Sequence, residues 1–171
     1  FLQKELGIPI HGGVPMQQNQ NQGHQNYMPP QQHVLAKIIN NIQTINMCGP
    51  EVHSESYISA NTCIASENGA YFAKMQDDGN FVVYCSTHFH HTNSIWSSKT
   101  VHKGEAPFYL KVQNDGNVVV YDKNEKALWA SKTDGKGHGP YILKMQDDGN
   151  LVLYDSAHSS LWSTGTNRKN D

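Results

Sequence analysis

Five residue types recur at one fixed spacing in three places along this chain of 171 residues. The pattern is Gln-x-Asp-x-Asn-x-Val-x-Tyr, at residues 76–84, 113–121 and 146–154. Amide, carboxylate and phenol groups together supply both hydrogen-bond donors and acceptors, which suits a ligand rich in hydroxyl groups. The candidate binding residues are Gln76, Asp78, Asn80, Val82, Tyr84, Gln113, Asp115, Asn117, Val119, Tyr121, Gln146, Asp148, Asn150, Val152 and Tyr154.

The hairpin register at each copy decides which of these side chains converge. A two-residue Asp-Gly turn would mix polar and apolar side chains on both faces of the hairpin. A three-residue loop over 77–79, with left-handed Gly79, instead pairs Gln76 with Asn80 and gathers the apolar side chains on one face. We therefore predict the three-residue loop in all copies. The predicted inner face comprises Ala73, Met75, Phe81, Val83, Leu110, Val112, Val118, Val120, Leu143, Met145, Leu151 and Leu153.

The outer face of each hairpin then carries the repeated polar residues around a valine. Asp, Gly and Asn are common in turns for purely structural reasons. Turn formation does not explain why Gln and Tyr recur at fixed offsets on an exposed face. Sugar hydroxyls donate and accept hydrogen bonds, and the C–H face of a sugar ring needs an apolar contact. We interpret the outer faces as carbohydrate-binding sites.

Each copy belongs to a longer repeat that must position it. The copies begin 37 and 33 residues apart, follow a β-like run, and end in a tryptophan with a hydroxyl-rich tail: Trp96 in WSSKT, Trp129 in WASKT and Trp162 in WSTGT. Repeats of this length are supersecondary units that bury their apolar faces against each other. We predict an all-β fold of three units that close around a pseudo-threefold axis or stack as sheets. We expect the tryptophans to fill the core with bonded indole N–H groups; the alternative is that they stack on sugar rings.

The pattern resembles the mannose-binding signature of the bulb-type (monocot mannose-binding) lectins, and the resemblance covers roughly residues 52–167. It implies a β-prism II fold of three four-stranded antiparallel sheets around a pseudo-threefold axis. It also implies metal-free binding of mannose and mannose-rich glycans. In each copy, Asp and Asn would contact the axial 2-hydroxyl, Gln the 3-hydroxyl, Tyr the 4-hydroxyl and Val the ring carbons.

The chain departs from this family in two places. The usual disulfide of the plant members uses a cysteine where Gly79 stands, so we expect Cys63 and Cys85 to link adjacent strands of the first sheet instead, and we leave Cys48 unassigned. From tyrosine to tryptophan the first repeat spans 12 residues, against 8 in the other two. This longer stretch could crowd, extend or specialise the first site.

Neither a metal site nor an active site is predicted. His88, His90 and His91 lie in the longer stretch without a carboxylate nearby in sequence, which is more typical of a solvated loop. The Asp-Asp-Gly loops offer too few oxygens for a calcium shell. No nucleophile–base pair stands out, and threefold repetition suits multivalent binding better than catalysis. We expect a protein that is not an enzyme and that needs no cofactor.

The first part of the chain is a separate prediction. We divide the whole chain into an N-terminal arm, 1–50, and a lectin domain, 51–171. The arm is rich in Gln and Asn, and residues 34–47 show the apolar spacing of a short helix. We expect this irregular or helical extension to mediate homo-oligomers. The alternative function is a structural, self-assembling protein in which the β-prism is a building block and the arm a cross-linker.

The charge and the first residue of the chain bear on the binding partners and the cellular compartment of the protein. The net charge of −2, without a basic stripe, argues against nucleic acid as a partner, and the short apolar runs argue against membrane insertion. The first residue is Phe1, which fits a cleaved signal peptide as well as a cloning boundary or a partial sequence. We predict a secreted protein, with a cytoplasmic one as the alternative.

Overall fold

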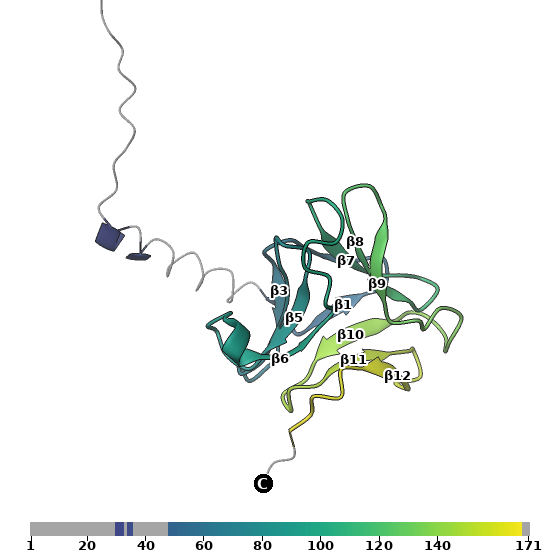
Figure 1. The fold of residues 1–171 in the computed structure, drawn as a ribbon. Coiled ribbons are helices and arrows are strands. Elements are labelled where there is room, and N and C mark those ends of the chain that lie inside the picture. The colour runs from purple at the N-terminus through teal and green to yellow at the C-terminus, as the bar shows by residue number, and fades with distance from the viewer. Residues whose placement is uncertain (1–29, 33, 36–47, 169–171) are drawn as a thin grey trace, which may run out of the picture.

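The computed structural model describes residues 30–32, 34–35 and 48–168. Residues 51–163 form three antiparallel sheets of four strands each, arranged around a common centre (Figure 1). The predicted β-prism is confirmed. The first sheet contains β3 (Cys63–Ala65), β4 (Phe72–Met75), β5 (Phe81–Tyr84) and β6 (Ser94–Ser97); the second, β2 (Tyr57–Ser59), β7 (Tyr109–Val112), β8 (Val118–Tyr121) and β9 (Ala127–Ala130); the third, β1 (Glu51–His53), β10 (Ile142–Met145), β11 (Leu151–Tyr154) and β12 (Ser160–Ser163).

The three short strands β1, β2 and β3, here called the linking strands, connect the sheets to one another. β1 pairs with β10, β2 with β7 and β3 with β4, so residues 51–65 contribute one edge strand to every sheet. The central residues Val52, Ile58 and Ile64 follow at intervals of six and are only 8, 3 and 4% exposed. Burying one apolar side chain per linking strand ties residues 51–65 to all three sheets.

The hairpin register agrees with the three-residue loop predicted from the sequence. In the first sheet Met75 lies opposite Phe81, and the N–H of Gln76 donates to the carbonyl of Asn80 at 2.9 Å. Gly79 has a φ of +86°, the left-handed value that this loop requires. The other two hairpins share this register. All predicted inner-face residues belong to one buried cluster.

The tryptophans lie together at the centre of the prism. Trp96, Trp129 and Trp162 contribute one ring from each sheet, and the three ring pairs meet edge to face with centroids 5.4 to 5.6 Å apart. This arrangement confirms that they pack inside rather than act as sugar platforms. The expected indole hydrogen bonds are absent among the described residues. The rings are only partly buried, so their N–H groups can be hydrated instead.

The predicted disulfide between Cys63 and Cys85 is wrong. Cys63 is bonded to Cys48, and Cys85 is a free thiol. The expectation fails because β4 lies between β3 and β5. Two strand spacings amount to about 10 Å, whereas a disulfide spans at most about 7 Å between Cα atoms. The free Cys85 follows Tyr84 directly, at the position that Asp122 and Asp155 hold in the other repeats.

Most of the N-terminal arm lies outside the described residues. Val34 and Leu35 are helical, with 57 and 59% of their surface exposed, but the remainder of the predicted helix, 36–47, is not described. The role of the arm in assembly therefore stays a prediction. In the described part of the chain, no helix has the length and apolar character needed to cross a bilayer.

Candidate functional site

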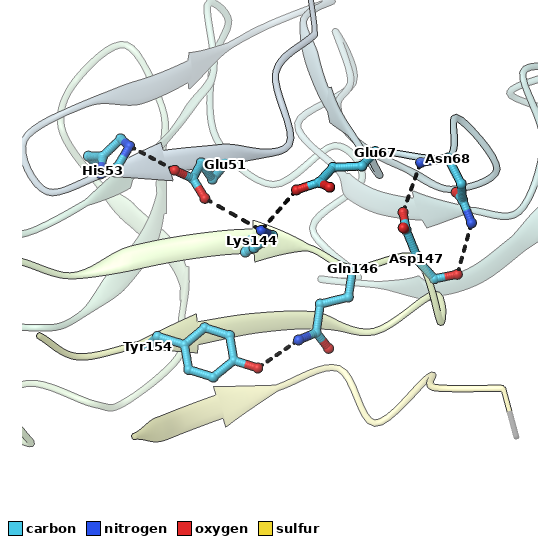
Figure 2. Close-up of polar contacts among 8 residues, drawn as sticks. All are labelled: Glu51, His53, Glu67, Asn68, Lys144, Gln146, Asp147 and Tyr154. Atoms are coloured by element: carbon cyan, nitrogen blue, oxygen red, sulfur yellow. Dashed lines mark hydrogen bonds and ion pairs between the residues drawn. The ribbon is translucent and has the colours of Figure 1, made fainter. Parts of the chain in front are cut away.

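The hairpins bring the repeated Gln and Tyr into direct contact. Both project from the outer face of the same hairpin, eight residues apart, and the Gln Nε2 donates to the Tyr hydroxyl oxygen at 2.6, 2.8 and 2.6 Å in the first, second and third copies. Figure 2 shows this bond between Gln146 and Tyr154. The phenol accepts here, so its own proton remains available to a ligand, as does the Gln carbonyl oxygen.

The repeated Asp is held in place by the backbone of its own loop. In each copy Oδ1 accepts the N–H of the Asn two residues later, at 3.0, 2.9 and 2.9 Å. This is the usual way in which Asp stabilises a turn. The second carboxylate oxygen, Oδ2, accepts no hydrogen bond from the described residues. The turn thus consumes one oxygen of Asp78, Asp115 and Asp148 and leaves the other for a ligand.

The repeated Asn is oriented by the hydroxyl-rich tail that follows each tryptophan. In the first copy the Asn80 Oδ1 accepts from the Ser98 hydroxyl and from the Thr100 N–H, both at 3.2 Å. Asn117 and Asn150 accept equivalent bonds from residues 131, 133 and 164–166. The tail therefore engages the oxygen of the amide and leaves its two N–H donors for a ligand.

The same tail fixes the backbone of the loop. Thr100, Thr133 and Thr166 donate their hydroxyls to the carbonyls of the loop glycines, each at 2.6 Å. This role of the recurring tail is not predicted from the sequence. The signal was present, because a hydroxyl residue stands two and four positions after every tryptophan.

A second anchor comes from the turns that follow the linking strands. Asn61 donates to the Asp77 carboxylate at 2.6 Å, and the backbone N–H of Asn114 donates to Glu55 at 3.0 Å. In the third copy the Asn68 N–H donates to Asp147 at 2.9 Å (Figure 2). The first loop residue of every copy is thus tied to the segment 55–68. Each loop is held from both sides before any ligand binds.

The hydroxyl tail offers a direct stability test. Replacing Thr133 by Val keeps the shape of the side chain but leaves the buried Gly116 carbonyl without its hydroxyl donor. We expect the free energy of unfolding to fall by about 1–2 kcal/mol, measured by urea denaturation. The control is Thr62→Val, because the Thr62 hydroxyl donates to a carbonyl in an exposed turn, where water can replace it. Equal effects of the two substitutions would contradict the role given to the tail.

The valines of the pattern lie deeper than expected. Val82, Val119 and Val152 are only 2, 3 and 2% exposed. They form the floor beneath the polar side chains of each copy rather than an open apolar patch. Any sugar contact with them is therefore confined to a small area.

The longer stretch of the first repeat folds over the first site. It contains a 3₁₀ helix, η1 (His91–Asn93), and the Phe89 ring contacts the Tyr84 ring at a centroid distance of 5.3 Å. Tyr84 is left only 3% exposed. Burial raises the pKa of its phenol, as does the Asp78 carboxylate, while the hydrogen bond with Gln76 lowers the pKa. The stretch both crowds the site and deepens it into a hollow of about 420 Å³.

The second and third sites differ from the first in their surroundings. At the second, Tyr109 stacks on Tyr121 with ring centroids 5.4 Å apart. At the third, Lys144 lies between Glu67, at 3.1 Å, and Glu51, at 3.9 Å (Figure 2). The hydrogen bond with Glu67 is the main cause that raises the pKa of Lys144. The same polar residues thus have different neighbours in the three sites: an aromatic ring that covers the first, an aromatic stack beside the second, and ion pairs beside the third.

The histidines of the longer stretch lie at the edge of the first site. The rings of His90 and His91 lie 4.0 Å apart at the rim of the first hollow. Within residues 30–32, 34–35 and 48–168, no three His, Cys, Asp or Glu side chains are placed to hold an ion together.

Comparison with solved structures gives clear matches, each with a probability of 1.00. A monomeric monocot mannose-binding lectin from Gastrodia elata is 33% identical, with a TM-score of 0.61; the match covers 70% of this chain and all of that one. A lectin from garlic, Allium sativum, is 37% identical with a TM-score of 0.54, over 68% of this chain and all of that one.

The mannose-specific agglutinin of snowdrop, Galanthus nivalis, solved with methyl-α-D-mannoside, is 30% identical with a TM-score of 0.56 over 71% of this chain and all of that one. No protein-family model matches the sequence, and a search of curated proteins finds no match. The structural matches thus span the complete length of three plant lectins.

Proposed function

The chain belongs to the bulb-type (monocot mannose-binding) lectin family, and on that premise we propose that it binds mannose and mannose-rich glycans. The proposed sites are the three outer faces that carry Gln, Asp, Asn, Val and Tyr, and binding needs no metal ion. The partners are glycans or glycoproteins that display mannose. The complex of the snowdrop agglutinin with methyl-α-D-mannoside supports this choice of sugar.

One observation carries the proposal: in all three copies the same atoms have no hydrogen-bond partner among the described residues. Each site offers an Asp Oδ2 and a Gln Oε1 as acceptors, and Asn N–H and Tyr O–H groups as donors. Every remaining atom of these side chains that could form a hydrogen bond is engaged in holding the site together. Neighbouring hydroxyls of one sugar ring can each donate to an acceptor and accept from a donor of this set.

The geometry suits weak sites that act together. A shallow site with a few hydrogen bonds typically binds a monosaccharide with a Kd on the order of millimolar, about −4 kcal/mol. Three such sites on one prism can engage a mannan surface together, which raises the apparent affinity by about 10²-fold or more. The three sheets face in different directions, which favours branched or surface-bound glycans over a short free chain.

The proposal is tested with mannan-agarose and the full chain. We expect the protein to be retained, to be eluted by methyl-α-mannoside, and to be retained equally well in EDTA, because the proposed sugar contacts are hydrogen bonds and a valine contact. Galactose, which lacks the axial 2-hydroxyl, is the matched eluent that should fail. A protein that passes through the column would refute mannose binding. Loss of retention in EDTA that calcium restores would refute the metal-free site.

A further inference from the structure

The linking strands make the three sheets unequal. At matching positions on the outer face, opposite a lysine of the next strand, they carry Glu51 in the third sheet, Tyr57 in the second and Cys63 in the first. Glu51 is engaged in ion pairs, and Cys63 is 7% exposed in its disulfide. Tyr57, in contrast, is 64% exposed. An exposed apolar side chain suggests a binding surface when it is part of a contiguous patch, so the neighbours of Tyr57 decide its role.

Tyr57 continues an aromatic row that starts in the second site. The site residue Tyr121 stacks on Tyr109 at a centroid distance of 5.4 Å, and Tyr57 meets Tyr109 edge to face at 6.2 Å. In the other two sheets no aromatic row extends to the linking strand, which carries Cys63 or Glu51 in place of Tyr57. The counterparts of Tyr109 are Phe72, which is 0% exposed, and the aliphatic Ile142.

A hollow of about 570 Å³ lies beside this row. Its wall is formed by Tyr57, Pro107, Phe108 and Tyr109. The Lys111–Glu55 ion pair, with an N–O distance of 2.9 Å, adds a donor and an acceptor at its edge. Tyr109 and Lys111 also line the hollow of the second site, so the two hollows are adjacent.

We propose that this hollow is a subsite for the second sugar ring of a glycan whose terminal mannose occupies the second site. The inference rests on the proposed function. Aromatic faces carry negative charge density that attracts the C–H groups of a sugar ring, and small-ligand sites combine such apolar walls with a few polar groups. From Tyr121 to Tyr57 the path crosses two strand spacings, about 10 Å, which is comparable to the length of two linked rings.

The test isolates the second site in the full chain. The double substitution Asp78→Asn with Asp148→Asn removes the proposed acceptors of the first and third sites. In this background, calorimetric titrations compare methyl-α-mannoside with the methyl glycosides of the α-linked mannobioses. We expect the best disaccharide to bind about tenfold more tightly than the monosaccharide, which is the size of a stacking contribution.

Substitutions at Tyr57 then test whether this residue causes the tighter binding of the disaccharide. Tyr57→Ala should abolish the advantage of the disaccharide and leave monosaccharide affinity unchanged, whereas Tyr57→Phe, which keeps the ring, should retain it. The control is His53→Ala, an exposed residue on the linking strand of the third sheet. This substitution should change neither titration in the background variant.

Each other outcome overturns the subsite. The subsite is contradicted if the disaccharide binds no more tightly than the monosaccharide, or if its higher affinity is unchanged in Tyr57→Ala. Either result leaves the proposed function intact. Tyr57→Ala that lowers the mass measured by light scattering without changing disaccharide affinity would make Tyr57 part of a protein interface instead. If the unsubstituted chain binds neither sugar, the proposed function fails, and the subsite fails with it.

Discussion

Replacing Asp78, Asp115 and Asp148 together by Asn is expected to abolish retention on mannan. Oδ1 of each aspartate is occupied by the Asn N–H of its own turn, and an Asn side chain can keep that bond through its carbonyl oxygen. The substitution changes the free Oδ2 from a charged acceptor into an N–H donor. Loss of one hydrogen bond to a charged group costs about 1.5–3 kcal/mol, which leaves a millimolar site with no measurable affinity.

The chain supplies its own control for this variant. Asp77→Asn with Asp147→Asn changes the preceding loop residue, where the second repeat already has Asn114. We expect this pair to retain mannan binding, and both variants to keep the circular dichroism spectrum of the unsubstituted protein. Mannan binding that survives the triple substitution would contradict the site, as would its loss in the control pair.

Replacing Trp129 by Ala is expected to have the largest effect on stability. The ring contacts Trp96 and Trp162 at centroid distances of 5.5 and 5.4 Å, and it packs against the buried cluster. Truncating a packed tryptophan costs about 3 kcal/mol or more, because the cavity collapses only partly. We expect the urea midpoint to fall accordingly, while the folded fraction binds methyl-α-mannoside as before.

Trp129→Phe is the matched substitution for this test. It retains a ring at the centre and should cost markedly less than Trp129→Ala. If Trp129→Ala left the stability unchanged and removed sugar binding, the tryptophan would be a stacking platform, and its assignment to the core would fail.

The fold could be predicted because each repeat shows the alternation of apolar and polar residues that is typical of a β-hairpin. Only the three-residue loop sorts every hairpin into an apolar and a polar face, so the alternation from Met75 to Phe81 determines the register without tertiary information. The recurring tryptophans likewise indicate three equivalent units with a shared centre. The contacts between Gln and Tyr follow from that register, since both stand on the outer face of one hairpin.

Other features depend on pairings between distant parts of the chain. The linking strands have three residues each, too few to show a period, and their partners lie as far away as β10. Only the spacing of six between Val52, Ile58 and Ile64 hinted at them. The disulfide of Cys63 could not be assigned without the strand order, and the cover over Tyr84 depends on how residues 85–93 fold back. The ligand of the sites is proposed from the side-chain atoms that have no hydrogen-bond partner and from membership of the bulb-type lectin family.

The most direct measurement of the central claim is a titration of the labelled full chain with methyl-α-mannoside, followed by nuclear magnetic resonance of side-chain N–H groups. We predict saturable shifts, with a Kd on the order of millimolar, of the amide resonances of the repeated Gln and Asn residues, and no change in the indole resonances. The residues to be followed are Gln76, Asn80, Gln113, Asn117, Gln146 and Asn150. Amide resonances that do not move at saturating sugar, or shifts confined to the indoles, would contradict the account.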